Sequence, residues 1–444
     1  MKRREFMKTA SLGAVAFAAL PNIGITWADV PSRKGKPITG RKLNVACIGI
    51  GGKGNQDVAS VASENIVALC DVDLIRANST FKKHPGAKQY RDFRRMLIEM
   101  DDQIDAVTIS TPDHMHFPVA MMAIKMGKHV FVQKPLTHTI AEARELTEAA
   151  RKHEVATQMG IQGHSMSGIR RMREWYAAKA IGEIKELHIW TNRPIWPQGI
   201  TAPLPAAPVP YTLDWNLWQG VAPERPYNKG YLPFKWRAWW DYGCGALGDI
   251  GCHAIDCAFD VLKLGSPTSV EAVCDQFNDQ TAPKWSIVTY QFPETAERGP
   301  IKFVWYDGNK SPERPQELEA GRKIPGGIGG QLWYGTKGTI MVNDVYCRSF
   351  RMIPEVKMRD FAKNRMPEKT EQKSIGHYKE WLRACRGGEP AGANFDYAGP
   401  LTELVLLGNL AVRSGKKIEW DSKKMICTNV PEANQFVKKQ YRVF

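Results

Sequence analysis

The feature that most constrains this fold is a glycine-rich turn between two apolar segments. Residues 43–50 are rich in small and β-branched side chains, as a buried parallel strand requires. Gly49, Gly51 and Gly54 follow in the spacing GxGxxG, and after a polar helical segment a second apolar run covers residues 66–70. An acidic residue ends that run. This order of strand, turn, helix, strand and acid predicts a dinucleotide-binding βαβ unit.

Each part of this unit has a physical role. The first glycine, Gly49, permits a tight turn. The second, Gly51, which Gly52 follows, lets the backbone approach a pyrophosphate, and the third, Gly54, lets the helix pack closely against the strand. Asp71 is predicted to accept hydrogen bonds from the adenosine ribose hydroxyls. Its carboxylate would repel a 2′-phosphate, so NAD is predicted. Arg76 lies close enough in sequence to accommodate that phosphate, so NADP is the alternative. A glycine turn that binds nothing is the structural alternative.

Strands and helices alternate through the first part of the chain. Residues 106–110, 128–132 and 156–159 have the pattern of strands, and residues 118–126 and 140–153 have the pattern of helices. Such alternation requires a doubly wound parallel sheet, in which ligands bind beyond the carboxyl ends of the strands. The candidate cofactor-binding residues at those ends are Thr111, His114, His116, Gln133 and Lys134.

The second part of the chain has a different pattern. Predicted strands follow one another at residues 182–190, 268–277, 285–292 and 301–305 with few helices between them, which indicates a largely antiparallel sheet. The predicted fold is therefore α/β, with a doubly wound parallel domain followed by an α+β domain. The predicted boundaries are a leader at 1–28, a linker at 29–40, a nucleotide domain at 41–160, a substrate and oligomerisation domain at 161–395, and a C-terminal helix and tail at 396–444.

The N-terminus has the layout of a twin-arginine export signal. Arg3 and Arg4 precede Phe6 and Lys8, and an apolar segment of residues 10–20 follows. This segment is too short for a spanning helix, so no stable membrane insertion is expected. An ordinary secretion signal or an uncleaved anchor is the alternative. Because twin-arginine export carries folded proteins, the sequence predicts a periplasmic protein that leaves the cytoplasm with its nucleotide already tightly bound.

Charge and cysteine content exclude some classes of function. The net charge is +15, but the basic residues are spread along the chain and no nucleic-acid-binding motif is present. The nine cysteines form no CxxC pair. Cys244, Cys252 and Cys257 lie near His253, yet this spacing matches no common zinc pattern, so no metal is predicted.

Several stretches together resemble the Gfo/Idh/MocA family of sugar-directed oxidoreductases. They are GIGGKG, STPDHMHFPVAMMAIKMGKHVFVQKPL and GALGDIGCHAIDCAFD, and the likeness extends from about Arg41 to the C-terminus. RPIWPQG, LDWNLWQG and TNVPEANQFVKKQYR resemble the exported subgroup of this family. The resemblance implies a Rossmann nucleotide domain, a carbohydrate substrate and a homo-oligomer. The chain departs from the family at Gln133-Lys134-Pro135, where Glu-Lys-Pro is usual, and a neutral Gln would raise the pKa of the lysine less than a carboxylate would.

The resemblance also assigns catalytic positions to Lys134, Asp249 and His253. The spacing of Asp249, His253 and Asp256 would place all three on one helix face if Gly248 opens a helix. A histidine oriented by a carboxylate is suited to take a proton from a sugar hydroxyl. The alternative for such a pair is surface electrostatics. Asp256 is the least certain of the three and is open to a structural role, and His377 is predicted to be a packing residue.

Tryptophans are concentrated between residues 190 and 240, where seven of the fourteen lie in a proline-rich, non-periodic stretch. Most of them are predicted to form a small packing core of a structured loop. One or two could contact the faces of a sugar ring. The candidate substrate contacts are Gln162, Trp196 and Trp236.

The sequence supports one main hypothesis and two alternatives. The main hypothesis is an NAD-dependent oxidoreductase that takes hydride from a ring carbinol of a sugar or glycoside. A redox-neutral NAD-dependent glycoside hydrolase would share the oxidation step and then eliminate, hydrate and reduce. A non-catalytic sugar or nucleotide sensor is disfavoured, because such a protein has no need of Lys134, Asp249 and His253 together.

Overall fold

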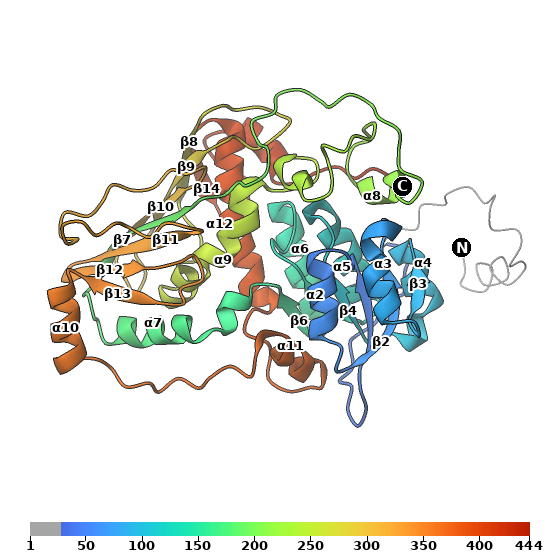
Figure 1. Ribbon diagram of the computed structural model, residues 1–444, viewed down its shortest axis with the longest axis horizontal. Coiled ribbons are helices and arrows are strands. Elements are labelled where there is room, and N and C mark those ends of the chain that lie inside the picture. The colour runs from blue at the N-terminus through green and yellow to red at the C-terminus, as the bar shows by residue number, and fades with distance from the viewer. Residues whose placement is uncertain (1–27) are drawn as a thin grey trace, which may run out of the picture.

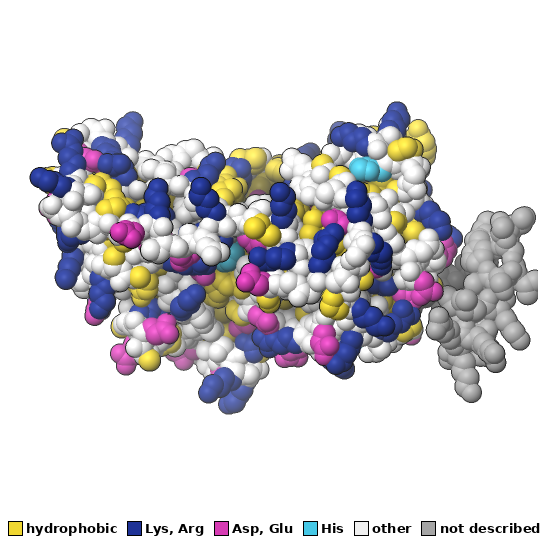
Figure 2. Space-filling model, turned by 90° about the horizontal axis from the view of Figure 1, so that it is seen from below, with side chains coloured by type: hydrophobic (Ala, Val, Ile, Leu, Met, Phe, Trp, Pro, Cys, Tyr) yellow, Lys and Arg dark blue, Asp and Glu magenta, His cyan; other side chains and the backbone are white. Residues whose placement is uncertain are grey.

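The computed structural model describes residues 28–444 and shows two sheets side by side along the long axis of the molecule (Figure 1). The predicted export signal therefore lies, apart from Ala28, outside the described residues. Within the described part, no helix is both long and apolar enough to cross a membrane. On the face drawn in Figure 2, basic side chains are spread along the length of the molecule rather than gathered into one stripe.

The first sheet is parallel, with strand order β3-β2-β1-β4-β5-β6. Its strands are β1 (Asn44–Ile48), β2 (Asn65–Cys70), β3 (Lys88–Tyr90), β4 (Ala106–Ile109), β5 (His129–Val132) and β6 (Thr157–Met159). Its helices are α2 (Lys53–Ser60), α3 (Leu74–Lys83), α4 (Phe93–Glu99), α5 (His116–Lys125) and α6 (Ile140–Lys152). The order reverses between β1 and β4, and a doubly wound sheet binds its ligand in the crevice at that point. This confirms the predicted Rossmann sheet.

The second sheet has nine strands in the order β13-β12-β11-β7-β10-β9-β8-β14-β15. All of its pairs are antiparallel except β7 with β10. Its strands are β7 (Ile184–Thr191), β8 (Ser269–Cys274), β9 (Ser286–Phe292), β10 (Ile301–Tyr306), β11 (Gly329–Gly335), β12 (Gly338–Val342), β13 (Phe350–Ile353), β14 (Ile418–Asp421) and β15 (Ile426–Cys427). The mostly antiparallel sheet is therefore confirmed.

One part of this domain is rich in charged residues and is still regularly folded. Residues 348–373 contain β13 and the helix α10 (Glu355–Asn364). Met358 and Phe361 of α10 are buried in the main hydrophobic core. Two apolar side chains three residues apart are enough to fix one face of a short helix, although charged residues dominate its composition.

Two central helices lie between the sheets and connect them (Figure 1). α9 (Gly245–Val261) begins at Gly245, three residues before the expected Gly248, and α12 (Phe395–Ser414) contacts both α9 and α6. α8 (Trp215–Gln219) lies in the tryptophan-rich loop, α7 (Ser167–Ala177) follows the first sheet, and α11 (His377–Cys385) precedes α12. Because α9 is buried along nearly all its length, its polar side chains are held in fixed positions between the domains.

Candidate active site

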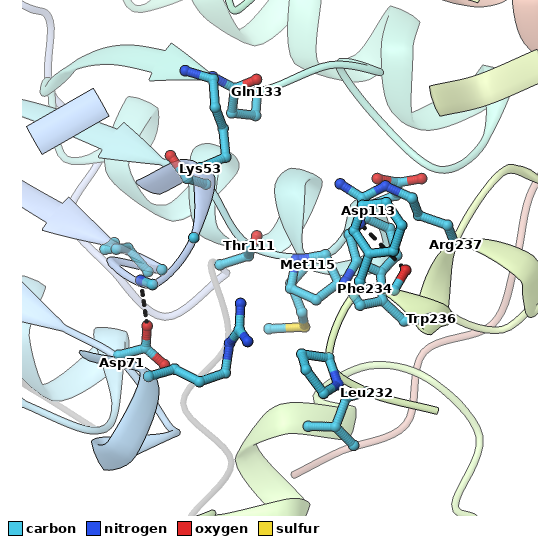
Figure 3. A pocket seen from close by; sticks show the side chains of 18 of the residues that line it. Lys53, Asp71, Thr111, Asp113, Met115, Gln133, Leu232, Phe234, Trp236 and Arg237 are labelled. Carbon is cyan, nitrogen blue, oxygen red and sulfur yellow. Dashed lines mark hydrogen bonds between the residues drawn. The ribbon is translucent and has the colours of Figure 1, made fainter. Parts of the chain in front are cut away.

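A cavity of about 510 Å³ lies where the carboxyl ends of the parallel strands face α9 (Figure 3). The β1–α2 turn forms one end of it, and α9 with the tryptophan-rich loop forms the other. The predicted site residues that line it are Gly49, Gly51, Gly52, Asp71, Thr111, Gln133, Lys134, Gln162, Trp236, Asp249 and His253. The volume is typical of a small-molecule site.

The glycine turn has the geometry that a bound pyrophosphate requires. Gly49 (φ 74°) and Gly52 (φ 55°) adopt left-handed conformations that favour glycine. Gly54 does not line the cavity. A Cβ added there would lie 1.7 Å from the carbonyl oxygen of Gly49, so the role of this glycine is to let α2 pack closely. None of the hydrogen bonds among residues 28–444 uses the amides of Gly52 or Lys53. These two amides at the start of α2 are therefore available to an anion.

Asp71 borders the cavity and also holds the turn (Figure 3). Its carboxylate accepts hydrogen bonds from the amides of Ile50 (2.9 Å), Gly51 (3.1 Å) and Asp73 (3.0 Å). Burial raises the pKa of this carboxyl group. The structure thus gives Asp71 a structural role in addition to the ribose contact predicted from the sequence. Arg76 lines the same end of the cavity.

His114 and His116 are not brought to the cavity, which corrects their predicted cofactor contact. Both are buried, and both ring nitrogens of each face backbone carbonyl oxygens. These oxygens belong to Tyr242 (3.2 Å) and Trp218 (3.1 Å) for His114, and to Pro135 (2.7 Å) and Thr111 (2.9 Å) for His116. Burial lowers the pKa of His114 to about 3 and that of His116 to about 4. Each neutral ring can donate from only one of its two nitrogens, and with that bond and its packing it positions the loop after β4 instead.

Lys134 and Asp249 are in direct contact at the inner end of the cavity. The Lys134 ammonium donates to Asp249 Oδ1 at 2.8 Å, and Arg237 Nε donates to the same oxygen at 2.7 Å. Burial alone would raise the pKa of Asp249, but the two cations outweigh it and lower that pKa below its ordinary value. Arg237 itself is held between the rings of Trp236 and Phe234, at 4.3 and 4.5 Å (Figure 3).

His253 lies one helical turn after Asp249 on α9, and the two are not hydrogen-bonded. The predicted orientation of this histidine by Asp249 is therefore wrong, because Lys134 and Arg237 occupy the carboxylate. His253 Nδ1 is buried without a hydrogen-bond partner in the described chain, and the ring of Tyr346 packs edge-on at 5.2 Å. Burial, with the charge of Lys134, lowers the pKa of His253 to about 3. The imidazole is thus neutral and faces the cavity.

Asp256 and His377 have structural roles away from the cavity. Asp256 accepts hydrogen bonds from His164 Nδ1 at 2.9 Å and from the Tyr397 hydroxyl at 2.6 Å. His377 pairs with the carbonyl oxygen of Met159 at 2.9 Å, as expected of a packing residue. Among residues 28–444, no group of three His, Cys, Asp or Glu side chains is placed to hold a metal ion.

A buried carboxylate that sequence reasoning missed explains the unusual Gln133. Asp57 is 0% exposed and accepts hydrogen bonds from Gln133 Nε2 (2.9 Å), Ser110 Oγ (2.7 Å) and the Tyr378 hydroxyl (2.5 Å). Lys53, four residues earlier on α2, completes the set as an ion pair. The only signal in the sequence is the Lys-Asp spacing just after the glycine turn.

The tryptophan-rich loop is mostly a packing core, as predicted. Trp196, proposed from the sequence as a substrate contact, is 4% exposed and packs with Trp215, Trp218 and Trp239 rather than lining the cavity. Trp236 and Gln162 do line it. Polar cavity residues that the sequence did not single out include Arg193, Arg237 and Tyr346.

Comparison with known proteins gives two consecutive family matches. Residues 43–161 match the Gfo/Idh/MocA oxidoreductase family, NAD-binding Rossmann fold. Residues 188–310 match the C-terminal alpha/beta domain of the same oxidoreductase family. Together the matches cover more than half of the chain and include most of both walls of the cavity.

Relatives and solved structures agree with these matches. D-glucoside 3-dehydrogenase of Escherichia coli is 26% identical over 280 residues, which are 60% of this chain and 68% of that protein. Glycosyl hydrolase family 109 protein 2 of Shewanella sp. (strain ANA-3) is 31% identical over 171 residues, 33% of this chain and 36% of that protein. The WlbA dehydrogenase of Bordetella pertussis, crystallised with NADH and UDP-GlcNAcA, has a TM-score of 0.59 at 16% identity, covering 86% of this chain and 99% of that chain. The last likeness shows a shared fold.

Proposed function

Because the chain belongs to the Gfo/Idh/MocA family of oxidoreductases, with an NAD-binding Rossmann domain, we propose that it oxidises a ring carbinol of a sugar or glycoside. The observation that supports this most is the convergence of Lys134, Asp249 and His253 on one end of a cavity whose other end is the glycine turn. The D-glucoside 3-dehydrogenase relative supports the substrate class.

The residues at the glycine turn fit a dinucleotide. The free amides of Gly52 and Lys53 would hold the pyrophosphate, and Asp71 would border the adenosine ribose. NAD, when bound, supplies the acceptor for the carbinol hydrogen.

Lys134 would stabilise the reacting oxygen. Its ammonium is aimed by the ion pair with Asp249, which Arg237 in turn fixes. A positioned cation beside an oxygen that gains negative charge stabilises the transition state, and the enclosed setting strengthens that interaction. Arg237 acts through Asp249, so it is a positioning residue.

His253 would take the hydroxyl proton. A proton acceptor must be neutral at the working pH, and burial beside Lys134 keeps His253 neutral. Because a pKa this low makes a weak base, the transfer also requires Lys134 to stabilise the alkoxide as the proton leaves. Its unpartnered Nδ1 leaves the ring free to turn or to bond a ligand, since no other side chain competes for that atom among the described residues.

A redox-neutral glycoside hydrolase is the second candidate, favoured by the Shewanella relative. Oxidation of the ring carbon acidifies the adjacent C–H, so the same Lys134 and His253 would serve elimination of the glycosidic bond. We further propose that the signal at residues 1–28 directs export to the periplasm. The exported protein would carry NAD tightly bound, because no evident pool of free NAD exists there. We also propose that the chain forms a homo-oligomer, which light scattering would test.

The test uses the purified chain loaded with NAD and a panel of sugars and glycosides. Nicotinamide absorbance and released products are followed together. Turnover that stalls after one equivalent until an acceptor is added identifies a dehydrogenase, and cleavage without lasting reduction identifies the hydrolase. Lys134→Met and His253→Asn should each lower kcat by about 10²–10⁴-fold, while Lys82→Met on α3 should not. Full activity of both site variants would overturn the assignment.

A further inference from the structure

A second cavity, of about 530 Å³, lies on the other side of the segment that leads into α9. It is enclosed by the C-terminal half of α12, by residues 240–244 and by the tail at residues 435–440, and it shares no lining residue with the active-site cavity. Its volume is in the range of small-molecule sites. Nothing in the proposed reaction uses it.

Arg413 is the charged group that distinguishes this cavity. Its guanidinium lies over the ring of Phe436 at 4.1 Å and over that of Trp240 at 5.2 Å. Within the described part of the chain it forms no hydrogen bond or ion pair, although burial lowers its pKa. Two aromatic faces stabilise a cation from the sides, but they leave the N–H edge of the guanidinium without an acceptor.

The other charges around the cavity are already paired. Lys439 contacts Glu142 at 3.1 Å, and Lys438 contacts Glu145 at 3.6 Å. Asp241 is held by Arg225 at 2.5 Å, and it acts on Arg413 only through space, as does Asp279. The neighbouring His138 is buried and its pKa is well below the ordinary value, so it adds no charge at neutral pH. Among the charged side chains that line the cavity in the described part of the chain, Arg413 is therefore the one with no hydrogen bond or ion pair, although Asp241 and Asp279 attract it through space.

We propose that this cavity binds an organic monocarboxylate with an apolar body. The guanidinium edge matches the two oxygens of a carboxylate, which it would hold in bidentate fashion. Leu406, Leu410 and Val221, together with the two aromatic rings, give the cavity an apolar surface for the rest of the ligand, beside polar side chains such as Asn409 and Gln435. A single unpaired cation favours a monoanion over a phosphate, which would draw on several cations at once.

Benzoate is the probe, titrated calorimetrically into the NAD-loaded chain, with benzyl alcohol as the neutral control of similar shape. Wild type should bind benzoate and not benzyl alcohol. Arg413→Gln should weaken benzoate binding at least 10-fold. Arg413→Lys keeps the positive charge but loses the two-pronged guanidinium edge, so its Kd should lie between those of wild type and Arg413→Gln. Arg365→Gln, which removes an exposed arginine over Phe361, should bind as wild type does.

Two further measurements keep the result interpretable. Circular dichroism of each variant reports folding, and Arg413→Lys tests the fork if Arg413→Gln does not fold. Lys134→Met should bind benzoate as wild type does, which separates this site from the active-site cavity whatever becomes of the proposed reaction. Equal binding of benzyl alcohol, unchanged binding by both Arg413 variants, or loss of binding in Lys134→Met would overturn the proposal.

Discussion

Gln133 donates a hydrogen bond to the buried carboxylate of Asp57 across 2.9 Å, beside the lysine proposed to be catalytic. The family pattern has Glu at this position, and a glutamate ionised at pH 8 would place two carboxylates in contact here. The neutral amide is therefore matched to Asp57, and the negative charge that the sequence lacks at 133 lies at 57 instead. The departure from the family pattern at Gln133 is therefore accompanied by a carboxylate at Asp57 that accepts its hydrogen bond.

Gln133→Glu should accordingly destabilise the protein by about 3 kcal/mol at pH 8, because a buried charge loses its donor and meets a like charge. The loss should be smaller at pH 5, where the new carboxyl group retains a proton. Urea unfolding at the two pH values measures both effects. Adding Asp57→Asn should restore much of the stability, since the amide and carboxylate are then exchanged; a double variant no more stable than Gln133→Glu alone would contradict this.

Asp71→Asn should narrow the preference for NAD over NADP. The amide oxygen still accepts hydrogen bonds from the turn, but the charge that repels a 2′-phosphate is gone, and Arg76 remains at the same end of the cavity. Titration of the nucleotide-free protein with both cofactors gives the ratio of Kd values. Asp102→Asn, an exposed carboxylate that does not line the cavity, is the matched control. Tighter binding of NADP by the unaltered chain would show that the assigned preference is wrong.

Asp113 should make stability depend on pH with an unusual sign. Burial raises the pKa of this carboxyl group from 3.8 to about 7, so between these values the folded chain holds a proton that the unfolded chain releases. The contribution of Asp113 to the free energy of unfolding is fully present below the unfolded pKa. It is lost as pH rises toward 7, at about 1.4 kcal/mol per pH unit. In Asp113→Asn this loss should be absent, so its stability relative to wild type should rise from pH 4 to pH 8. An unchanged difference across that range would refute the assignment.

Replacing Arg3 and Arg4 with lysine should retain the protein in the cytoplasm. The proposed twin-arginine route depends on that pair, whereas a general secretion signal needs only positive charge, which lysine keeps. Fractionation of cells that express each form, with immunodetection, gives the distribution. Undiminished export of the lysine variant would indicate the other route.

The sequence by itself determined the nucleotide domain and the class of the second domain. The glycine spacing, the period of the apolar residues and the alternation of strands with helices are local properties, and they are written in consecutive residues. The same holds for α9, whose register places Asp249 and His253 on the cavity side.

Tertiary structure alone decided which side chains meet. Asp57 and Gln133 are 76 residues apart, and Lys134 and Asp249 are 115 apart, so no spacing rule could pair them. The spacing of Asp249 and His253 suggested a pair, but the carboxylate of Asp249 is bonded to Lys134, from the segment after β5, and to Arg237, from the tryptophan-rich loop. His114 and His116 lie at a strand end where ligands bind, yet their ring nitrogens contact backbone carbonyl oxygens instead. A local pattern sets the direction of a side chain, whereas its partner depends on which distant segments pack against it.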